Sequence, residues 1–209
     1  MKRLAFLFSG QGSQHTGMGL DFIESNSIAK ERYRTAHHIL GWSVEDLSKS
    51  ERNDDLSITL YTQPAIYTLS CVIAETLRSA GVQPALVAGH SAGEFAALTI
   101  SGVWDFETGL RVIAERARFM HETSQPGAMS AVLGLPPDQV QSICEEWTEG
   151  IVRAANFNSP KQTVITGDPA AVQGIAVVLK EKGAKRVLPL KVSGAFHSPL
   201  MKEAQIQFA

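Results

Sequence analysis

The sequence predicts an α/β protein whose parallel-sheet core carries a smaller second subdomain. Two short apolar runs, residues 4–8 and 86–89, each lead into a glycine-containing loop. Continuous runs of this kind are typical of strands buried on both faces of a parallel sheet. Helical segments separate and follow these runs, and strands that alternate with helices indicate an α/β core. Beyond residue 126 the predicted order is strand, helix, strand, strand, helix, strand, which is the ferredoxin-like order.

Four helices are predicted in the core from capping residues and apolar spacing. In the longest of them, Thr62 is the expected N-cap, Pro64 lies in the first turn and Gly81 ends the helix. Asp105 is positioned to cap the last. The four predicted helices span residues 28–40, 62–80, 94–100 and 106–123.

The second subdomain is predicted over residues 126–192, as an insertion into the core. The core then comprises residues 1–125 and 193–209. Glycine and proline turns separate its elements. Its strands are expected at 129–133, 151–156, 162–166 and 186–192, and its helices at 137–147 and 169–182.

The totals exclude several classes of function. The 209 residues suffice for one substantial core and a smaller unit, and the formal net charge of −2 provides no basic field for nucleic acid. Cys71 and Cys144 match neither a disulfide framework nor a zinc spacing, and their apolar surroundings predict burial. No apolar run approaches the roughly 18 residues of a membrane span, and the N-terminal run is too short for a secretion signal. We therefore expect a cytoplasmic protein that binds no metal, membrane or nucleic acid.

The glycine-rich loop at residues 10–17 follows a predicted strand but does not fit a nucleotide-binding motif. His15 stands where a dinucleotide loop has its third glycine. Met18 and Gly19 stand where a P-loop has its lysine and hydroxyl residue, so the charge that holds phosphates is missing. The loop remains a ligand-binding candidate, because open α/β sheets bind ligands at the carboxyl ends of their strands.

The stretch GHSAGE, residues 89–94, matches the G-x-S-x-G pattern of a nucleophile elbow. In such an elbow the serine occupies a strained strand-to-helix turn, and the flanking glycines leave room for the backbone. The helix N-terminus then directs N–H groups at the same point, as an oxyanion site requires. Ser91 is therefore a candidate nucleophile, with a purely structural turn as the alternative. Glu94 fits a functional role or, as a first-turn carboxylate, the helix dipole.

A serine nucleophile needs a base, and His197 is the best placed of the six histidines. It lies just past the last predicted strand and after the serine in the chain, as in hydrolases. A structural or surface histidine is the alternative. His90 precedes Ser91, so its side chain should point away from it. The remaining histidines are expected in the glycine loop or on helix surfaces, namely His15, His37, His38 and His121.

Arg116 falls inside the apolar stripe of the predicted helix 106–123. It is four residues from both Val112 and Met120, whereas Arg111 and Arg118 project from the opposite side. A buried guanidinium needs a partner. That partner is either an internal carboxylate or an anionic ligand, and the planar fork suits a carboxylate. Beside a Ser–His site, an inward arginine suggests an acyl group that carries its own carboxylate.

The chain resembles the malonyl-CoA:acyl carrier protein transacylases and the related acyltransferase domains of polyketide synthases. The resemblance runs from Phe8 to Met201 and implies an α/β-hydrolase-like core with a ferredoxin-like insertion. The motifs that carry it, in order, are GQGSQ at 10–14, TQP at 62–64, GHSAGE at 89–94, Arg116 followed by Phe119 and Met120, NFNSP at 156–160 before Gln162, and GAFHS at 194–198.

The resemblance implies an acyltransferase that moves malonyl from malonyl-CoA to the phosphopantetheine thiol of an acyl carrier protein through a Ser91 ester, in fatty acid or polyketide biosynthesis. His197 would act as base and then acid, and the backbone N–H groups of Gln11 and Ala92 would form the oxyanion hole. No permanently bound cofactor is implied; coenzyme A thioester and carrier protein, alone or within a synthase, are the expected partners. The implied substrate-binding residues are Arg116, Gln63, Phe196, Asn158 and Gln162.

Three departures from the family qualify this expectation. Ala92 replaces a residue that is more often leucine, but its role belongs to a backbone N–H. Phe196 resembles malonyl-selective polyketide acyltransferases, because its ring would crowd an α-methyl group. Family members continue well past the histidine motif and supply a residue that orients His197, whereas this chain stops at Ala209. We therefore expect a fragment, or a protein whose remainder lies elsewhere, with apolar surface left open.

Other functions fit parts of the sequence. A serine acyl hydrolase acting on carrier-protein thioesters would use the same scaffold, although it gains nothing from the inward Arg116. A docking module without activity would keep only carrier binding. The pair Lys185 and Arg186 could contact the carrier protein or the phosphates of coenzyme A, or could simply be solvated.

Overall fold

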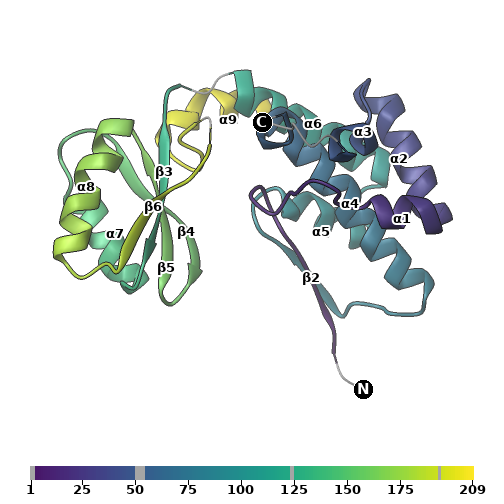
Figure 1. Ribbon diagram of the computed structural model, residues 1–209, viewed down its shortest axis with the longest axis horizontal. Coiled ribbons are helices and arrows are strands. Elements are labelled where there is room, and N and C mark those ends of the chain that lie inside the picture. The colour runs from purple at the N-terminus through teal and green to yellow at the C-terminus, as the bar shows by residue number, and fades with distance from the viewer. Residues whose placement is uncertain (1–2, 50–54, 123–124, 193) are drawn as a thin grey trace. The chain divides into compact units, whose positions relative to one another are not determined.

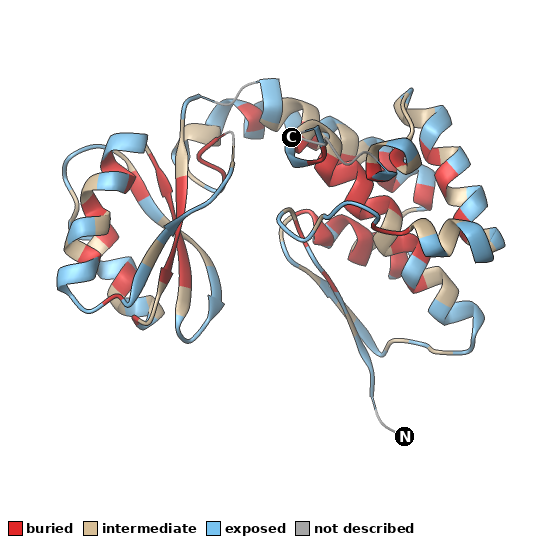
Figure 2. Cartoon of the chain, viewed as in Figure 1, coloured by how far each residue is buried: buried red, intermediate tan, exposed pale blue. Residues whose placement is uncertain are grey.

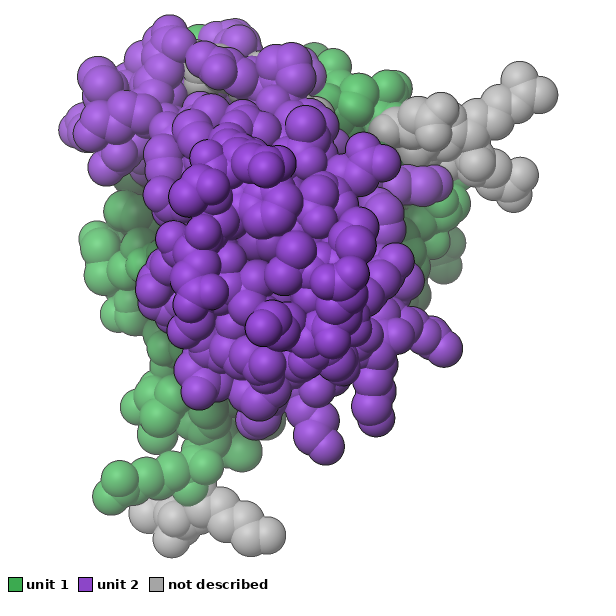
Figure 3. Space-filling view, turned by 90° about the vertical axis from the view of Figure 1, so that its left-hand side faces the viewer, with its two compact units in different colours: residues 1–118 green, residues 119–209 purple. Residues whose placement is uncertain are grey.

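The computed structural model describes residues 3–49, 55–122, 125–192 and 194–209. The chain forms two compact units, Met1–Arg118 and Phe119–Ala209 (Figure 1 and Figure 3). The first contains a parallel sheet and the second an antiparallel sheet, so the predicted α/β class is confirmed. The predicted division at residues 126 and 192 stays a prediction.

The sheet of the first unit consists of β1, Ala5–Phe8, and β2, Leu86–Gly89, paired in parallel with Ala5 opposite Leu86. Helix α5, Gly93–Ile100, packs against both strands. Phe8 is buried, but Leu7 is 77% exposed. The expectation that both strands are buried on both faces is therefore wrong, as the pale and tan strands in Figure 2 show. An apolar run predicts a strand, but it does not show which element covers each face.

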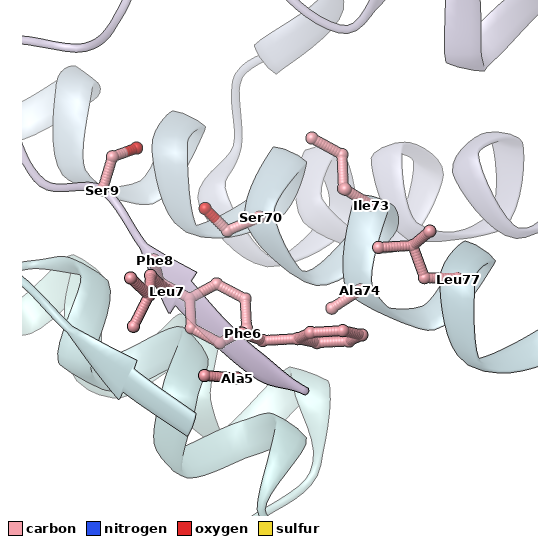
Figure 4. A pocket seen from close by; sticks show the side chains of 9 residues that line it. All are labelled: Ala5, Phe6, Leu7, Phe8, Ser9, Ser70, Ile73, Ala74 and Leu77. Atoms are coloured by element: carbon pink, nitrogen blue, oxygen red, sulfur yellow. The ribbon is translucent and has the colours of Figure 1, made fainter. Parts of the chain in front are cut away.

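A shallow apolar groove of about 270 Å³ runs between β1 and α4, Thr59–Ser79 (Figure 4). Ile73 and Leu77 of α4 line one side, and residues 5–9 line the other. The carbonyl of Phe8 accepts a hydrogen bond from the His90 N–H, on the β2 side. Neighbouring residues of a strand direct their backbone N–H and C=O groups to opposite edges of that strand. The backbone groups of Leu7 therefore point away from β2.

Helices make up most of the first unit. Its core is formed by buried side chains of α2, α4, α5 and α6, among which Tyr67, Leu110 and Ile113 are almost fully enclosed. Asn26 caps α2 by accepting from the N–H groups of residues 28 and 29. The helices other than α4 and α5 are α1, Leu20–Ser25; α2, Ser27–Leu40; α3, Val44–Lys49; the 3₁₀ turn η1, Asp55–Ser57; and α6, Phe106–Glu122.

Two predicted caps have different outcomes. Asp105 caps α6 by accepting from the Thr108 N–H at 2.8 Å, and these backbone and side-chain hydrogen bonds lower the pKa of its carboxyl. Thr62 is not the N-cap of α4, because the helix begins three residues earlier. Its hydroxyl instead donates to the carbonyls of Leu56, in η1, and Ile58, the residue directly before α4. The predicted end of α6 at residue 123 lies outside the described residues.

The second unit has the predicted ferredoxin-like arrangement. Its strand order is β4–β5–β3–β6, and each neighbouring pair is antiparallel. Helices α7 and α8 lie on one side of this sheet (Figure 1), where they share a core with its strands. The elements are β3, Ala128–Leu133; α7, Pro137–Glu146; β4, Val152–Ser159; β5, Gln162–Gly167; α8, Pro169–Glu181; and β6, Arg186–Pro189.

After β6 the chain forms a turn, the 3₁₀ segment η2, Pro199–Met201, and α9, Lys202–Phe208. Cys71 and Cys144 are free and buried as predicted, and burial raises their thiol pKa values to about 12 and about 11. Within the described residues, no helix is long and apolar enough to cross a membrane.

Candidate active site

Ser91 occupies a strained elbow between β2 and α5. Its φ of 51° lies in the left-handed region, which serine rarely adopts. A Cβ at Gly89 would come within 2.1 Å of the Glu94 nitrogen, and one at Gly93 within 2.2 Å of the Phe8 oxygen. Both glycines are therefore required by close backbone approach, as the G-x-S-x-G pattern predicts.

The glycine loop packs directly against this elbow. A Cβ at Gly10 would lie 2.4 Å from the carbonyl oxygen of His90 and 3.2 Å from its Nδ1. The loop is also bonded within itself, since the Ser13 hydroxyl donates to the Gly10 carbonyl at 2.8 Å and the Gly12 N–H donates to Gln14 Oε1 at 2.7 Å. The loop therefore presents Gln11 beside the elbow in a defined conformation.

Two backbone N–H groups near Ser91 are available to a ligand. Among the described residues, neither the Gln11 N–H nor the Ala92 N–H has an acceptor. Ala92 precedes the first residue of α5 and is 3% exposed, so its N–H belongs to the positive end of that helix. Glu94 is exposed in the first turn of the same helix, which agrees with the dipole role. Unpaired N–H groups at a helix N-terminus can stabilise a negatively charged oxygen.

Arg116 turns inward from α6 and contacts Ser91. Its two terminal nitrogens donate to the Gln63 amide oxygen and, at 3.2 Å, to Ser91 Oγ. Its guanidinium lies 5.5 Å from the centre of the Phe95 ring, which supports it from one side. Burial lowers the pKa of Arg116, although the charge of Glu94 opposes this shift.

The hydrogen-bond partners of Arg116 bear on an alternative that the sequence left open, an internal carboxylate or an anionic ligand. Among the described ion pairs, none joins Arg116 to a carboxylate. The guanidinium is instead held by neutral oxygens, so its positive charge remains available to an anion. The opposite face of α6 behaves as expected, because Arg118 pairs with Glu115 at 2.7 Å on the surface.

His197 lies in the second unit, in the loop that follows β6. Like Ser91, it has a left-handed backbone, with a φ of 60°. The Ser198 hydroxyl holds this loop by donating to the Ala195 carbonyl at 2.6 Å. Ala195 packs closely on Gly127, because a Cβ added at Gly127 would lie 2.2 Å from the backbone nitrogen of Ala195. The loop therefore has a defined backbone and presents an exposed imidazole.

Of the other predicted residues of the second unit, Phe196 is buried and the rest are exposed or half-buried. Phe196 is 5% exposed and packs with Met129 and Val164 of the sheet. Asn158 is exposed near the end of β4, and Gln162 begins β5 opposite Ser159. The exposed Lys185 and Arg186 precede and begin β6, and no described ion pair includes them. The described residues contain no group of His, Cys, Asp or Glu that could hold a metal.

Two further residues contribute to the site, and no sequence motif indicates them. Phe95 supports the Arg116 guanidinium, and Thr59 accepts a hydrogen bond from the Gln11 side chain at 3.1 Å. Phe95 is a buried residue in the first turn of α5, and its sequence position gives no signal that its ring faces Arg116. The contact of Thr59 joins residues 48 positions apart and leaves no signal in the sequence.

Comparisons with known proteins agree with this geometry. Residues 5–209 match the acyl transferase domain family. The malonyl CoA-acyl carrier protein transacylase of Synechocystis is 44% identical over 99% of this chain and 68% of its own length.

Solved structures agree as well. The crystal structure of the Synechocystis transacylase matches with a TM-score of 0.90 and 42% identity, over 99% of this chain and 68% of that one. A malonyl-transacylase in complex with a type II polyketide synthase acyl carrier protein matches with a TM-score of 0.94 and 36% identity, over 99% and 68%. With the elbow, the inward arginine and these matches taken together, the chain belongs to the malonyl-CoA:acyl carrier protein transacylase family.

Proposed function

We propose that this protein transfers a malonyl group from malonyl-CoA to the phosphopantetheine thiol of an acyl carrier protein through an ester on Ser91. The observation that carries the proposal is the Arg116 guanidinium, which donates to Ser91 Oγ and has no carboxylate partner among the described residues. A bidentate cation beside the nucleophile suits an acyl group that ends in a carboxylate.

The reaction has two mirrored halves. In the first, His197 accepts the proton of Ser91 as the hydroxyl attacks the thioester carbonyl, and the N–H groups of Gln11 and Ala92 stabilise the oxyanion. The tetrahedral intermediate collapses to the Ser91 ester, and coenzyme A leaves as a thiol with the proton from His197. In the second half the carrier thiol attacks the ester, His197 takes its proton, and Ser91 regains one.

Substrate selection is assigned to five further residues. Arg116, oriented by Gln63, binds the malonyl carboxylate, and the Phe196 ring excludes an α-methyl group, with Asn158 and Gln162 lining the substrate path. Malonyl-CoA enters this reaction as the donor substrate and not as a bound cofactor. The acyl carrier protein of the solved transacylase complex supports the assigned partner. We place the reaction in the cytoplasm, where both thioesters are used.

Mass spectrometry after mixing with malonyl-CoA tests the proposal. The wild-type protein should gain one malonyl group on Ser91, and Ser91→Ala should gain none. Ser101→Ala is the matched control, because Ser101 lies at the other end of α5 and bonds only within that helix, to Leu98 at 2.8 Å. An adduct that persists in Ser91→Ala, or a folded wild-type protein without one, would contradict the proposal. Equal turnover of acetyl and malonyl thioesters to free acid would indicate a hydrolase instead.

A further inference from the structure

We propose that the first turns of α4 act as a positioning element for the reaction, with Thr59 holding the oxyanion loop and Gln63 holding the carboxylate anchor. The inference rests on the proposed function and assigns a role to Thr59, whose hydroxyl bonds to the Gln11 side chain. Thr59 and Gln63 are four residues apart on one helix, so they lie on the same face, about 6 Å apart along the axis.

Thr59 connects the loop to the helix. Its Oγ1 accepts a hydrogen bond from the Gln11 side-chain amide at 3.1 Å, and its side chain is fully buried. The other hydrogen bonds of the loop tip, from Gly12 and Ser13, stay within the loop. The Thr59 contact holds the Gln11 side chain against α4 while Gly10 packs on His90, and together they hold the Gln11 N–H relative to the body of the unit.

Gln63 connects the same helix face to Arg116. Its amide oxygen accepts from one guanidinium nitrogen while a second donates to Ser91 Oγ. Gln63 is 1% exposed, so it cannot turn to solvent when substrate binds. One rigid helix thus sets the spacing between the oxyanion donor and the cation that holds the far end of the acyl group.

The start of α4 is itself anchored, which this role requires. The Thr62 hydroxyl donates to the carbonyls of Leu56 and Ile58 at 2.6 and 2.9 Å, and locks the first turns. Residues 62–68 of the helix are buried without interruption. Catalytic groups are effective when surrounding contacts hold them within about 0.5 Å of the productive geometry, and they lose rate when held loosely.

The two supports predict different kinetic signatures. The oxyanion donor acts on every acyl donor, so Thr59→Val should lower kcat about tenfold or more for malonyl-CoA and acetyl-CoA alike, with KM little changed. Thr59→Ser keeps the acceptor and should restore most of the rate. Gln63→Met releases the arginine, so it should lower malonyl transfer selectively and reduce the malonyl-to-acetyl ratio.

Thr76→Val is the matched control. Thr76 lies near the other end of α4, and its hydroxyl accepts from the Asn26 side-chain amide at 2.8 Å, the same kind of bond that Thr59 makes. It should lower the melting temperature by an amount comparable to Thr59→Val while leaving kcat and the acyl selectivity unchanged. A merely structural Thr59 would behave as Thr76 does.

A second variant removes the donor of the same bond. Gln11→Met keeps the backbone N–H but lacks the amide, and Gln11 is only partly buried, so folding should tolerate it. Thr59→Val and Gln11→Met remove the same hydrogen bond. The double variant should therefore have a kcat no lower than that of the slower single variant. The inference is overturned if Gln11→Met keeps the wild-type kcat, or if the two effects multiply. If the wild-type protein forms no malonyl adduct at all, the proposed function fails first, independently of Thr59.

Discussion

At the scale of single residues, the site depends on backbone conformations that side chains normally avoid. Ser91 and His197 are the two non-glycine residues with positive φ among those described, and they are the two that the sequence motifs assigned to the chemistry. Left-handed backbone at a bulky residue costs of order 1–3 kcal/mol, so it persists only where surrounding contacts enforce it. This strain supports the assignment of both residues to the reaction.

Arg116 is where the sequence was most informative. Its position between Val112 and Met120 predicted an inward guanidinium, and its bonds to Gln63 and Ser91 confirm this. Helical spacing could show the direction of the side chain because α6 is long and regular. It could not show the acceptors, which come from α4 and the elbow, 53 and 25 positions away.

We predict that Arg116→Ala lowers kcat/KM for malonyl-CoA by about 10- to 100-fold, the usual effect of losing a hydrogen bond to a charged group. Acetyl-CoA carries no second carboxylate, so its turnover should fall much less. Arg116→Lys should be intermediate for malonyl-CoA, because an ammonium lacks the planar fork. Steady-state kinetics with both thioesters measure this. A parallel loss for both substrates would show that Arg116 serves the fold and not the carboxylate.

At the scale of elements, the elbow is a contact of backbone with backbone. We predict that Gly93→Ala costs about 1–3 kcal/mol of unfolding free energy, as overpacking does, because the new Cβ would lie 2.2 Å from the Phe8 oxygen. Acyl transfer should also fall, since α5 must move and Ser91 moves with it. Gly174→Ala is the control, because there the new Cβ meets only the edge of the Trp147 ring at 2.9 Å.

Chemical denaturation and kinetics of both variants check this prediction. The control should change stability by less than about 1 kcal/mol, because alanine also improves helix propensity in α8. If Gly93→Ala kept both wild-type stability and wild-type rate, the packing of α5 on β1 would differ from that described here.

Most elements could be predicted from the sequence, because periodicity and caps are local signals. The ferredoxin-like order and helices α2, α4, α5, α6, α7 and α8 follow from them. The helices α1 and α3, with six residues each, are too short to show a period. The start of α4 was placed too late because Thr62 resembles a cap, whereas its hydroxyl donates to the carbonyls of two residues that precede the helix, Leu56 and Ile58.

At the scale of the whole molecule, burial depends on what covers each face, and local sequence carries no information about this. Residues 4–8 predicted a doubly buried strand, yet adjacent residues of β1, whose side chains lie on opposite faces, differ sharply in exposure. Leu7 is 77% exposed while Phe8 is 8% exposed. The exposed face borders the groove beside α4.

We predict that Leu7→Ala changes the unfolding free energy by less than about 1 kcal/mol, because little of the side chain is removed from water. Phe8→Ala, one residue away, should cost about 3–5 kcal/mol, as expected for a large core side chain. Urea denaturation of the 209-residue chain measures both. Equal losses at the two positions would show that the face carrying Leu7 is covered in solution.

The glycine contacts of the elbow also determine how this protein can be redesigned. Positions 10, 89 and 93 have no side chain that could repack after a change, so a mutational library gains nothing by varying them. Gln63 and Phe95 instead contact the Arg116 guanidinium from two other helices. Variation there, with Arg116 itself, can reshape the anion site for extender units that carry a different terminal group. The nucleophile and its turn can meanwhile stay unchanged.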